Sequence, residues 1–186
     1  MAEITKEKVV ELRQKTGAGL IDCKRALVGS AGDVDEAVAI LRKKGVATAA
    51  KKAGREAGEG VIACKVAEDS RSGVIVEVNC ETDFVAKNED FLVFADEIAC
   101  TLLSDPNADL EDKRTEQVAK IGENICISRS DAFSSEVSGR IESYVHTGGK
   151  VGVLMALSTE SEAGANNEET CALAKDLCMQ VAATAP

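Results

Sequence analysis

Aromatic and imidazole side chains are scarce in this sequence, which has no Trp, one Tyr, four Phe and one His among 186 residues. Its seven cysteines form no C-x-x-C pair, and a single imidazole cannot support a Cys/His metal cluster. We therefore expect no metal site and no cofactor. We predict that the cysteines are reduced and mostly buried as small apolar side chains, which is typical of a reducing compartment.

Long hydrophobic runs are missing as well. No apolar run approaches the roughly 18 residues of a membrane span, and residues 1–6 lack the basic and then apolar stretch of a signal peptide. We therefore expect a cytosolic protein, or one of an organellar matrix or stroma if the source is a eukaryote. With 45% hydrophobic residues, the chain can bury a core in one or two compact units.

Signatures of catalysis are also absent from the sequence. His146 is the only imidazole, no cysteine lies near it in the sequence, and no G-x-S-x-G or phosphate-loop pattern is present. We therefore expect no enzyme activity and a role in protein binding. Two alternatives stay open: an enzyme with a reactive cysteine, which a thiol reagent would reveal, and a ubiquitin-binding adaptor, which a ubiquitin pull-down would reveal.

Charge divides the chain into a basic head and an acidic body. Residues 1–58 contain 12 Lys/Arg and 8 Asp/Glu, whereas residues 59–186 contain 10 and 24. An acidic body repels nucleic-acid phosphates and anionic membranes, so we expect neither as a partner. The basic head could contact such surfaces, or it could steer the chain toward an acidic protein.

The head is predicted to be a three-helix docking domain over residues 1–46. Apolar residues recur at three- and four-residue steps from Leu20 to Leu41, as an apolar helix face requires. Asp33 is expected to begin the third helix and Gly45 to end it. Residues 47–59, rich in Ala, Lys and Gly, are predicted to form a helical linker.

The body contains an internal repeat with an offset of 79 residues, which places Gly60 on Gly139 and Val74 on Val153. Each copy is predicted to contain two strands and a helix, which cannot bury their apolar faces alone. We therefore predict an α+β fold in which the two copies form an α/β sandwich with antiparallel strands and flanking helices. The expected subdomains are 60–138, including a connecting helix at 109–120 and a strand at 123–129, and 139–186.

The two copies differ after their second strand. Copy one has Asp83 and Phe84 at the start of a helix, whereas the corresponding stretch of copy two, 158–164, has no aromatic residue. Because aromatics are so rare here, Phe84 on a polar loop is a candidate interface residue. The alternative is that Phe84 belongs to the core and that Asp83, or Asn88, is a helix cap.

A resemblance is carried by the segments Glu3–Arg13, Lys15–Leu27, Glu77–Ala86, Lys120–Ile125 and Ser143–His146. These segments together resemble bacterial-type elongation factor Ts, and their Thr-Gly-Ala-Gly and Thr-Asp-Phe-Val-Ala motifs are specific to that family. The resemblance implies a head similar to ubiquitin-associated domains and a two-part core. It also implies that the chain binds elongation factor Tu, in its nucleotide-free or GDP form, and speeds the release of GDP.

The resemblance also assigns partner-binding roles to nine residues: Thr82, Asp83, Phe84, Val85, Arg13, Leu20, Ile21, Lys24 and His146. In the family, the matching Asp-Phe pair reaches toward the magnesium and phosphate site of the GTPase. The residues themselves leave other interpretations open: Leu20 and Ile21 could be core residues, Lys24 part of a solvated face, and His146 structural. Homodimerisation is left open, and longer members of the family continue beyond the point at which this sequence stops.

Overall fold

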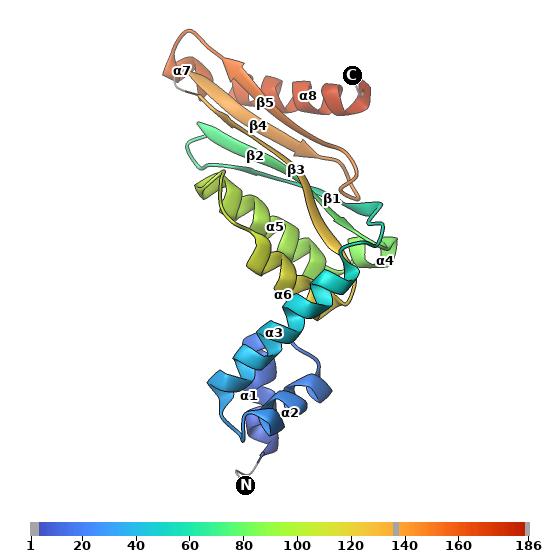
Figure 1. The fold of residues 1–186 in the computed structure, drawn as a ribbon. Coiled ribbons are helices and arrows are strands. Elements are labelled where there is room, and N and C mark those ends of the chain that lie inside the picture. Colours follow the sequence, from blue (N-terminus) through green and yellow to red (C-terminus); the bar gives the residue numbers. More distant parts are fainter. Residues whose placement is uncertain (1–3, 136–137, 185–186) are drawn as a thin grey trace. The chain divides into compact units, whose positions relative to one another are not determined.

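The computed structural model describes residues 4–135 and 138–184 (Figure 1). The chain divides into two compact units. One comprises Met1–Glu56 and Glu111–Ile125, and the other comprises Ala57–Leu110 and Cys126–Pro186. Helices and antiparallel strands are both present, so the prediction of an α+β fold is confirmed.

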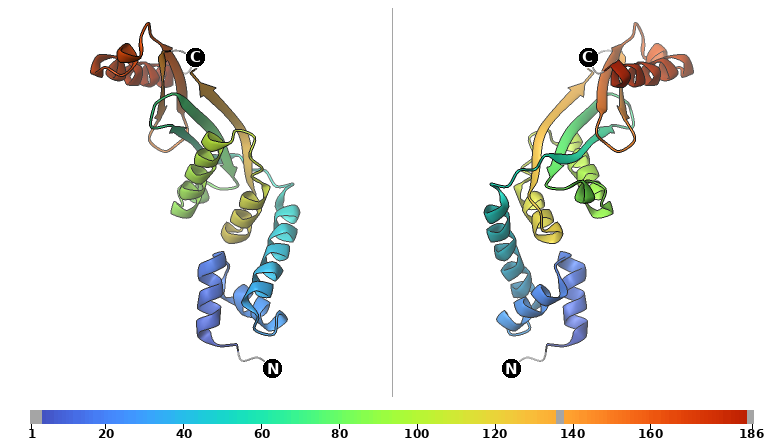
Figure 2. Two further views of the ribbon diagram at one scale, coloured as in Figure 1. Left: turned by 90° about the vertical axis from the view of Figure 1, so that its left-hand side faces the viewer. Right: turned by 90° about the vertical axis from the view of Figure 1, so that its right-hand side faces the viewer.

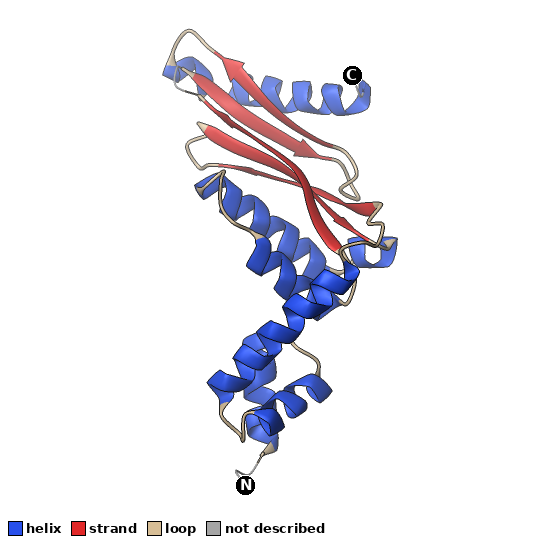
Figure 3. Ribbon diagram, in the orientation of Figure 1, coloured by secondary structure: helices blue, strands red, loops and turns tan. Residues whose placement is uncertain are grey.

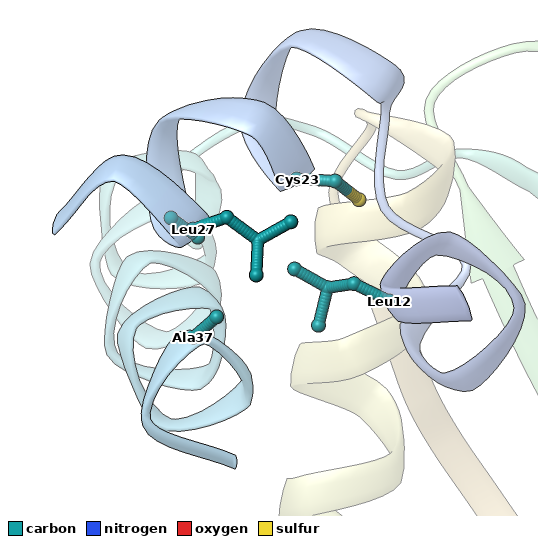
Figure 4. Close-up of a cluster of buried hydrophobic side chains, with 5 residues drawn as sticks. Leu12, Cys23, Leu27 and Ala37 are labelled. Carbon is teal, nitrogen blue, oxygen red and sulfur yellow. The ribbon is translucent and has the colours of Figure 1, made fainter. Parts of the chain in front are cut away.

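The first unit is helical and contains α1 (Lys6–Thr16), α2 (Leu20–Gly29), α3 (Val34–Lys52) and α6 (Glu111–Ile121). The side chain of Asp33 accepts a hydrogen bond from the amide of Glu36 at 2.9 Å, as expected for the cap of the third helix. The core of the three-helix head consists of buried side chains from all three helices (Figure 4). They include Leu12, Cys23, Leu27 and Ala37.

The prediction that Gly45 ends the third helix is wrong. α3 continues through Gly45 to Lys52, and so includes the first part of the segment expected to be a linker. Gly45 is buried, and a Cβ atom there would lie 3.4 Å from the Cβ of Ala119. This distance is that of an ordinary van der Waals contact, so this face of α3 packs against α6. α6 belongs to the first unit, although the sequence analysis placed this helix within the core.

The second unit contains two sheets between two long helices. Strands β1 (Glu59–Val66) and β2 (Ser72–Cys80) are antiparallel, and β3 (Ile125–Ser134) is the neighbour of β2. Strands β4 (Gly139–Val145) and β5 (Gly152–Ser158) form a second antiparallel sheet. Helix α5 (Glu89–Ser104) covers the first sheet and α8 (Glu168–Thr184) covers the second, which gives four layers (Figures 2 and 3).

The order strand, strand, short helix, long helix occurs twice in this unit. The short helices are α4 (Asp83–Ala86), before α5, and α7 (Glu162–Ala165), before α8. Hydrogen bonds between the two sheets are reciprocal: the amide of Ile62 donates to Gly149 O, and the amide of Ile141 donates to Ser70 O, both at 2.7 Å. Ile141 and Gly149 stand 79 positions after Ile62 and Ser70 respectively.

Glycines allow the two sheets to approach closely. A Cβ atom on Gly73 would lie 2.6 Å from Cγ2 of Ile141, and one on Gly152 would lie 2.5 Å from Cγ2 of Ile62. Real side chains do not approach so closely, so each glycine makes room for the isoleucine of the opposite sheet. The contact on one side of the sandwich has a counterpart on the other.

None of the helices in the described parts of the chain is long and apolar enough to cross a membrane. Within the same residues, no group of His, Cys, Asp and Glu is arranged to hold a metal ion. Three of the seven cysteines are buried, three are intermediate and Cys100 is exposed, so the prediction of mostly buried thiols holds only in part. Burial raises the pKa of the Cys64 thiol to about 11, which makes it a poor nucleophile at neutral pH.

Candidate protein-binding site

The short helix α4 is held in place by its backbone and by two small side chains. Thr82 has an extended backbone and precedes the helix, and its hydroxyl accepts a hydrogen bond from the amide of Val85 at 3.3 Å. The thiol of the buried Cys80 donates to the carbonyl of Thr82 at 3.2 Å. At the other end, Ala86 is only 5% exposed. The turn is therefore anchored on its inner side, which leaves the outer side chains of Asp83 and Phe84 in solvent.

Phe84 is the most exposed large apolar side chain in the described residues, at 82%. By contrast, Phe91 is fully buried and Phe94 is 5% exposed, both on the adjacent α5. The alternative that Phe84 belongs to the core is therefore wrong. A phenyl ring in water loses the free energy that burial would provide, so a site that keeps it exposed is a candidate contact surface. Its role in binding stays a prediction.

Asp83 forms an ion pair with Lys87, one helical turn further on. The Asp83 Oδ2 atom lies 2.7 Å from Lys87 Nζ, and both side chains are exposed. The hydrogen bond from Lys87 lowers the pKa of the Asp83 carboxyl, and the same bond raises the pKa of Lys87. The side chain of Thr82 caps α4, and that of Asn88 caps α5, so the alternative of Asn88 as a cap is confirmed and that of Asp83 is wrong.

His146 follows β4 in the turn that leads to β5. Its amide donates to Val151 O at 2.9 Å, and Nδ1 lies 2.8 Å from the hydroxyl oxygen of Tyr144. The next part of the turn is fixed to β1 by the bond from the Ile62 amide to Gly149 O. The imidazole is therefore presented on a turn that is tied to both sheets of the unit.

One hollow of about 490 Å³ brings the end of α4 and His146 together. Its lining includes Ala86, Lys87, Leu92, Val145 and His146. Leu92 and Val145 are 45% and 38% exposed, so apolar surface continues between the α4 turn and the histidine. These five residues therefore line one concave surface, although the sequence analysis assigned a binding role only to His146 among them.

The four predicted head residues are all exposed in the first unit. Leu20 and Ile21 are 51% and 69% exposed, so the alternative that they are core residues is wrong. Together with Lys24 and Val9, they line a shallow groove at the start of α1 and α2. Arg13 lies on the exposed surface of α1, outside the lining of that groove.

Sequence reasoning missed Lys87, Leu92 and Val145. A signal for Lys87 was present, because a basic residue four positions after an acidic one can pair with it on a helix. Leu92 and Val145 had no such signal, since their neighbourhood depends on how β1 and α5 meet the turn after β4.

An exposed aromatic ring beside an acid, on a turn that is anchored at its inner side, is typical of protein-binding surfaces. Comparison with known proteins places this chain in a family. A family model described as "Elongation factor TS" matches residues 81–186, which is more than half of the chain. The chain therefore belongs to the elongation factor Ts family.

Individual relatives agree with this assignment. Elongation factor Ts of Clostridium botulinum (strain Alaska E43 / Type E3) is 44% identical over 197 residues, which cover 98% of this chain and 63% of the relative. The protein of that name from Clostridium perfringens (strain SM101 / Type A) is 46% identical over 198 residues, with the same shares covered. The one from Symbiobacterium thermophilum is 48% identical over 189 residues, which cover 98% of this chain and 62% of the relative. The chain spans less than two thirds of the length of these relatives.

Proposed function

We propose that this chain is a guanine nucleotide exchange factor without catalytic chemistry of its own, acting in translation elongation in the cytoplasm. It binds elongation factor Tu in the nucleotide-free or GDP form and promotes release of GDP. The observation that carries the proposal is the exposed Phe84 ring on the anchored α4 turn, within the region matched by the family model.

In this proposal Phe84 is the wedge that disturbs the magnesium and phosphate contacts of the GTPase, and Thr82, Asp83 and Val85 form the rest of the turn. Burying a phenyl side chain contributes on the order of 1.5–3 kcal/mol. If the ring is buried only against the opened GTPase, this difference favours the opened state roughly tenfold to a hundredfold. The free protein supports such a role, because Phe84 is 82% exposed and breaks few contacts of its own chain when it binds.

The remaining predicted residues contribute to binding of the partner outside the α4 turn. Leu20 and Ile21 offer apolar area at the head groove, whereas Arg13 and Lys24 provide positive charge that can steer association. His146 contacts a further part of the partner from the far side of the hollow that begins at Lys87.

We also propose that the second unit consists of two copies of one ancestral element, and that the α1–α3 head is similar to ubiquitin-associated domains. The reciprocal bonds of Ile62 and Ile141, and the reciprocal glycine contacts, support the two-copy interpretation. The subdomains would then be 60–138, without α6, and 139–186. Homodimerisation is a further proposal that sedimentation can test.

The direct test measures the release of a fluorescent GDP analogue from elongation factor Tu after mixing with the chain. The wild type should accelerate release, and Phe84→Ala should remove most of that acceleration. Phe133→Ala is the matched control, because Phe133 is another partly exposed phenylalanine, 39% exposed on β3 and outside the site. A wild-type chain that leaves the release rate unchanged would refute the proposed function.

Thermodynamic reciprocity provides an independent check. If the chain weakens GDP binding by some factor, GDP must weaken binding of the chain to the GTPase by the same factor. Titration of GDP with Mg²⁺ into the complex should therefore dissociate it. A complex that is equally tight at saturating GDP would exclude the exchange mechanism.

A further inference from the structure

The charge next to the α4 turn suggests a residue that acts through Asp83. We propose that Lys87 is a positioning residue of the α4 site: its ammonium group holds the Asp83 carboxylate in the orientation in which the partner accepts it. The inference rests on the proposed function, because this orientation matters only when α4 meets a partner.

The ion pair spans the whole of α4. Asp83 is the first residue of this four-residue helix, and Lys87 is the residue that follows its last. So short a helix has few backbone hydrogen bonds to hold it, and the amide of Ala86 donates to Thr82 O at 3.1 Å. The 2.7 Å pair between Asp83 and Lys87 adds a second link along the outer side of the turn. It therefore restricts the carboxylate beside Phe84.

A second carboxylate also acts on Lys87. The charge of Glu59, at the start of β1, contributes to the raised pKa of Lys87. Glu59 is itself paired with Lys150 of the β4–β5 connection, with its Oε2 atom 2.5 Å from Nζ. The charges thus alternate from Asp83 through Lys87 and Glu59 to Lys150. Glu59 is in direct contact with Lys150 and acts on Lys87 only through its charge, whereas Asp83 is paired directly with the ammonium group of Lys87.

The corresponding turn α7 is arranged differently. Glu162 is its first residue, 79 positions after Asp83, and its carboxylate is bound at 2.6 Å by Arg71 from the β1–β2 connection. Lys150 stands 79 positions after Arg71, but it pairs with Glu59 rather than with Asp83. Of these two equivalent cations, Arg71 binds the acid of a short helix and Lys150 does not, and the acid of α4 is bound by its own Lys87 instead. This local arrangement occurs on the turn that carries the exposed ring.

A carboxylate held in one orientation loses less side-chain freedom when it binds. The pair is exposed, and exposed ion pairs are individually weak. We therefore expect the loss of Lys87 to weaken binding by about twofold to fivefold without changing the rate at saturation.

The experiment is a double-mutant cycle on the full chain. The chain concentration for half-maximal GDP-analogue release and the maximal rate are measured for the wild type, Lys87→Met, Lys87→Arg and Asp83→Asn, and for Lys87→Met combined with Asp83→Asn. Lys87→Met should raise the half-maximal concentration about twofold to fivefold, and Lys87→Arg should restore it. In the Asp83→Asn background, Lys87→Met should have no further effect.

A second readout needs no partner. The pKa of the Asp83 carboxyl, followed by NMR, should return toward its ordinary value in Lys87→Met. An effect of Lys87→Met of the same size in both backgrounds would overturn the positioning role, since Lys87 would then meet the partner itself. An unchanged half-maximal concentration, or an unchanged Asp83 pKa, would overturn it too. A wild-type chain without exchange activity would instead refute the proposed function, and this inference with it.

Discussion

The two short helices α4 and α7 are the same structural turn with different outer surfaces. In each, a hydroxyl group caps the start: Thr82 accepts from the Val85 amide at 3.3 Å, and Ser161 accepts from the Gly164 amide at 3.1 Å. Each ends on a buried alanine, at position 86 or 165. The sandwich therefore requires a cap and a small buried residue at this point of the chain.

The second position of each short helix faces outward, and the two helices differ there. It holds Phe84 in α4 and the exposed Ala163 in α7. Since α7 forms without a ring, the ring of α4 has no part in building the turn. A comparison within one chain thus separates residues that serve the fold from residues that remain available for contact.

The largest expected effect concerns the long helices that follow these turns. Phe94 of α5 is 5% exposed, so Phe94→Ala should leave a cavity and lower the free energy of unfolding by about 3–5 kcal/mol. Leu173, at the corresponding place on α8, is 51% exposed, and Leu173→Ala should cost less than about 0.5 kcal/mol. Urea unfolding of both variants measures the difference. Equal losses would show that α8 is covered in solution.

The next largest effect is on exchange. Phe84→Ala converts the outer surface of α4 to that of α7, and should reduce stimulated GDP release roughly tenfold to a hundredfold. The melting temperature should barely change, because the ring is exposed.

The converse change sharpens this result. Ala163→Phe places a ring on α7, where the acid is bound by Arg71 and no lysine follows the turn. This variant should neither destabilise the protein nor alter exchange. If Phe84→Ala instead melts the protein as severely as Phe94→Ala, the ring belongs to the fold and the comparison fails.

A smaller effect is expected at the caps. Thr82→Ala and Ser161→Ala each remove one side-chain acceptor from the start of a helix, and each should cost about 1 kcal/mol of stability. Thr82→Ala should also weaken binding to the GTPase, because α4 carries the contact residues. Melting and exchange are measured on both variants. Identical losses of exchange from the two changes would contradict the assignment of the site to α4.

The smallest effect is the pH dependence of the Asp83–Lys87 pair. The folded-state pKa of Asp83 is lowered, first of all by the hydrogen bond from Lys87. The stabilisation is therefore fully present above the unfolded value of about 3.9 and is lost as the pH falls through the folded value. The stability difference between wild type and Asp83→Asn should be constant from pH 7 to about 5 and should shrink below about 4. High salt should reduce it wherever Asp83 is ionised.

Regular spacing made much of this fold predictable. Alternation and three- to four-residue steps are local signals, and the expected order of two strands and a long helix is present both before and after β3. The strand expected at 123–129 continues further, to Ser134. Gly45 was misread because a glycine within a helix and a glycine after it look alike in sequence. The packing of α6 against this part of α3 is not visible in the local pattern.

For the candidate site, the sequence predicted the exposed Phe84 but not the hollow beside it. Phe84 stood out because aromatics are rare and the corresponding stretch lacks one. The hollow that joins Lys87 to His146 depends on a turn meeting β1 and α5, and no local pattern encodes such a meeting. For the same reason the sequence did not show that Lys150 pairs with Glu59.

The paired contacts between glycine and isoleucine make the sandwich an interlocked structure. Ile62 fits against Gly152 and Ile141 against Gly73, so neither sheet keeps its inner face covered once the other leaves. The two sheets should therefore come apart in a single opening event. In native-state amide exchange, the protons of Ile62 and Ile141, which bond across the sandwich, should share one opening free energy. The α4 turn, which packs on β1 and β2, would then lose the support of its sheet in the same event.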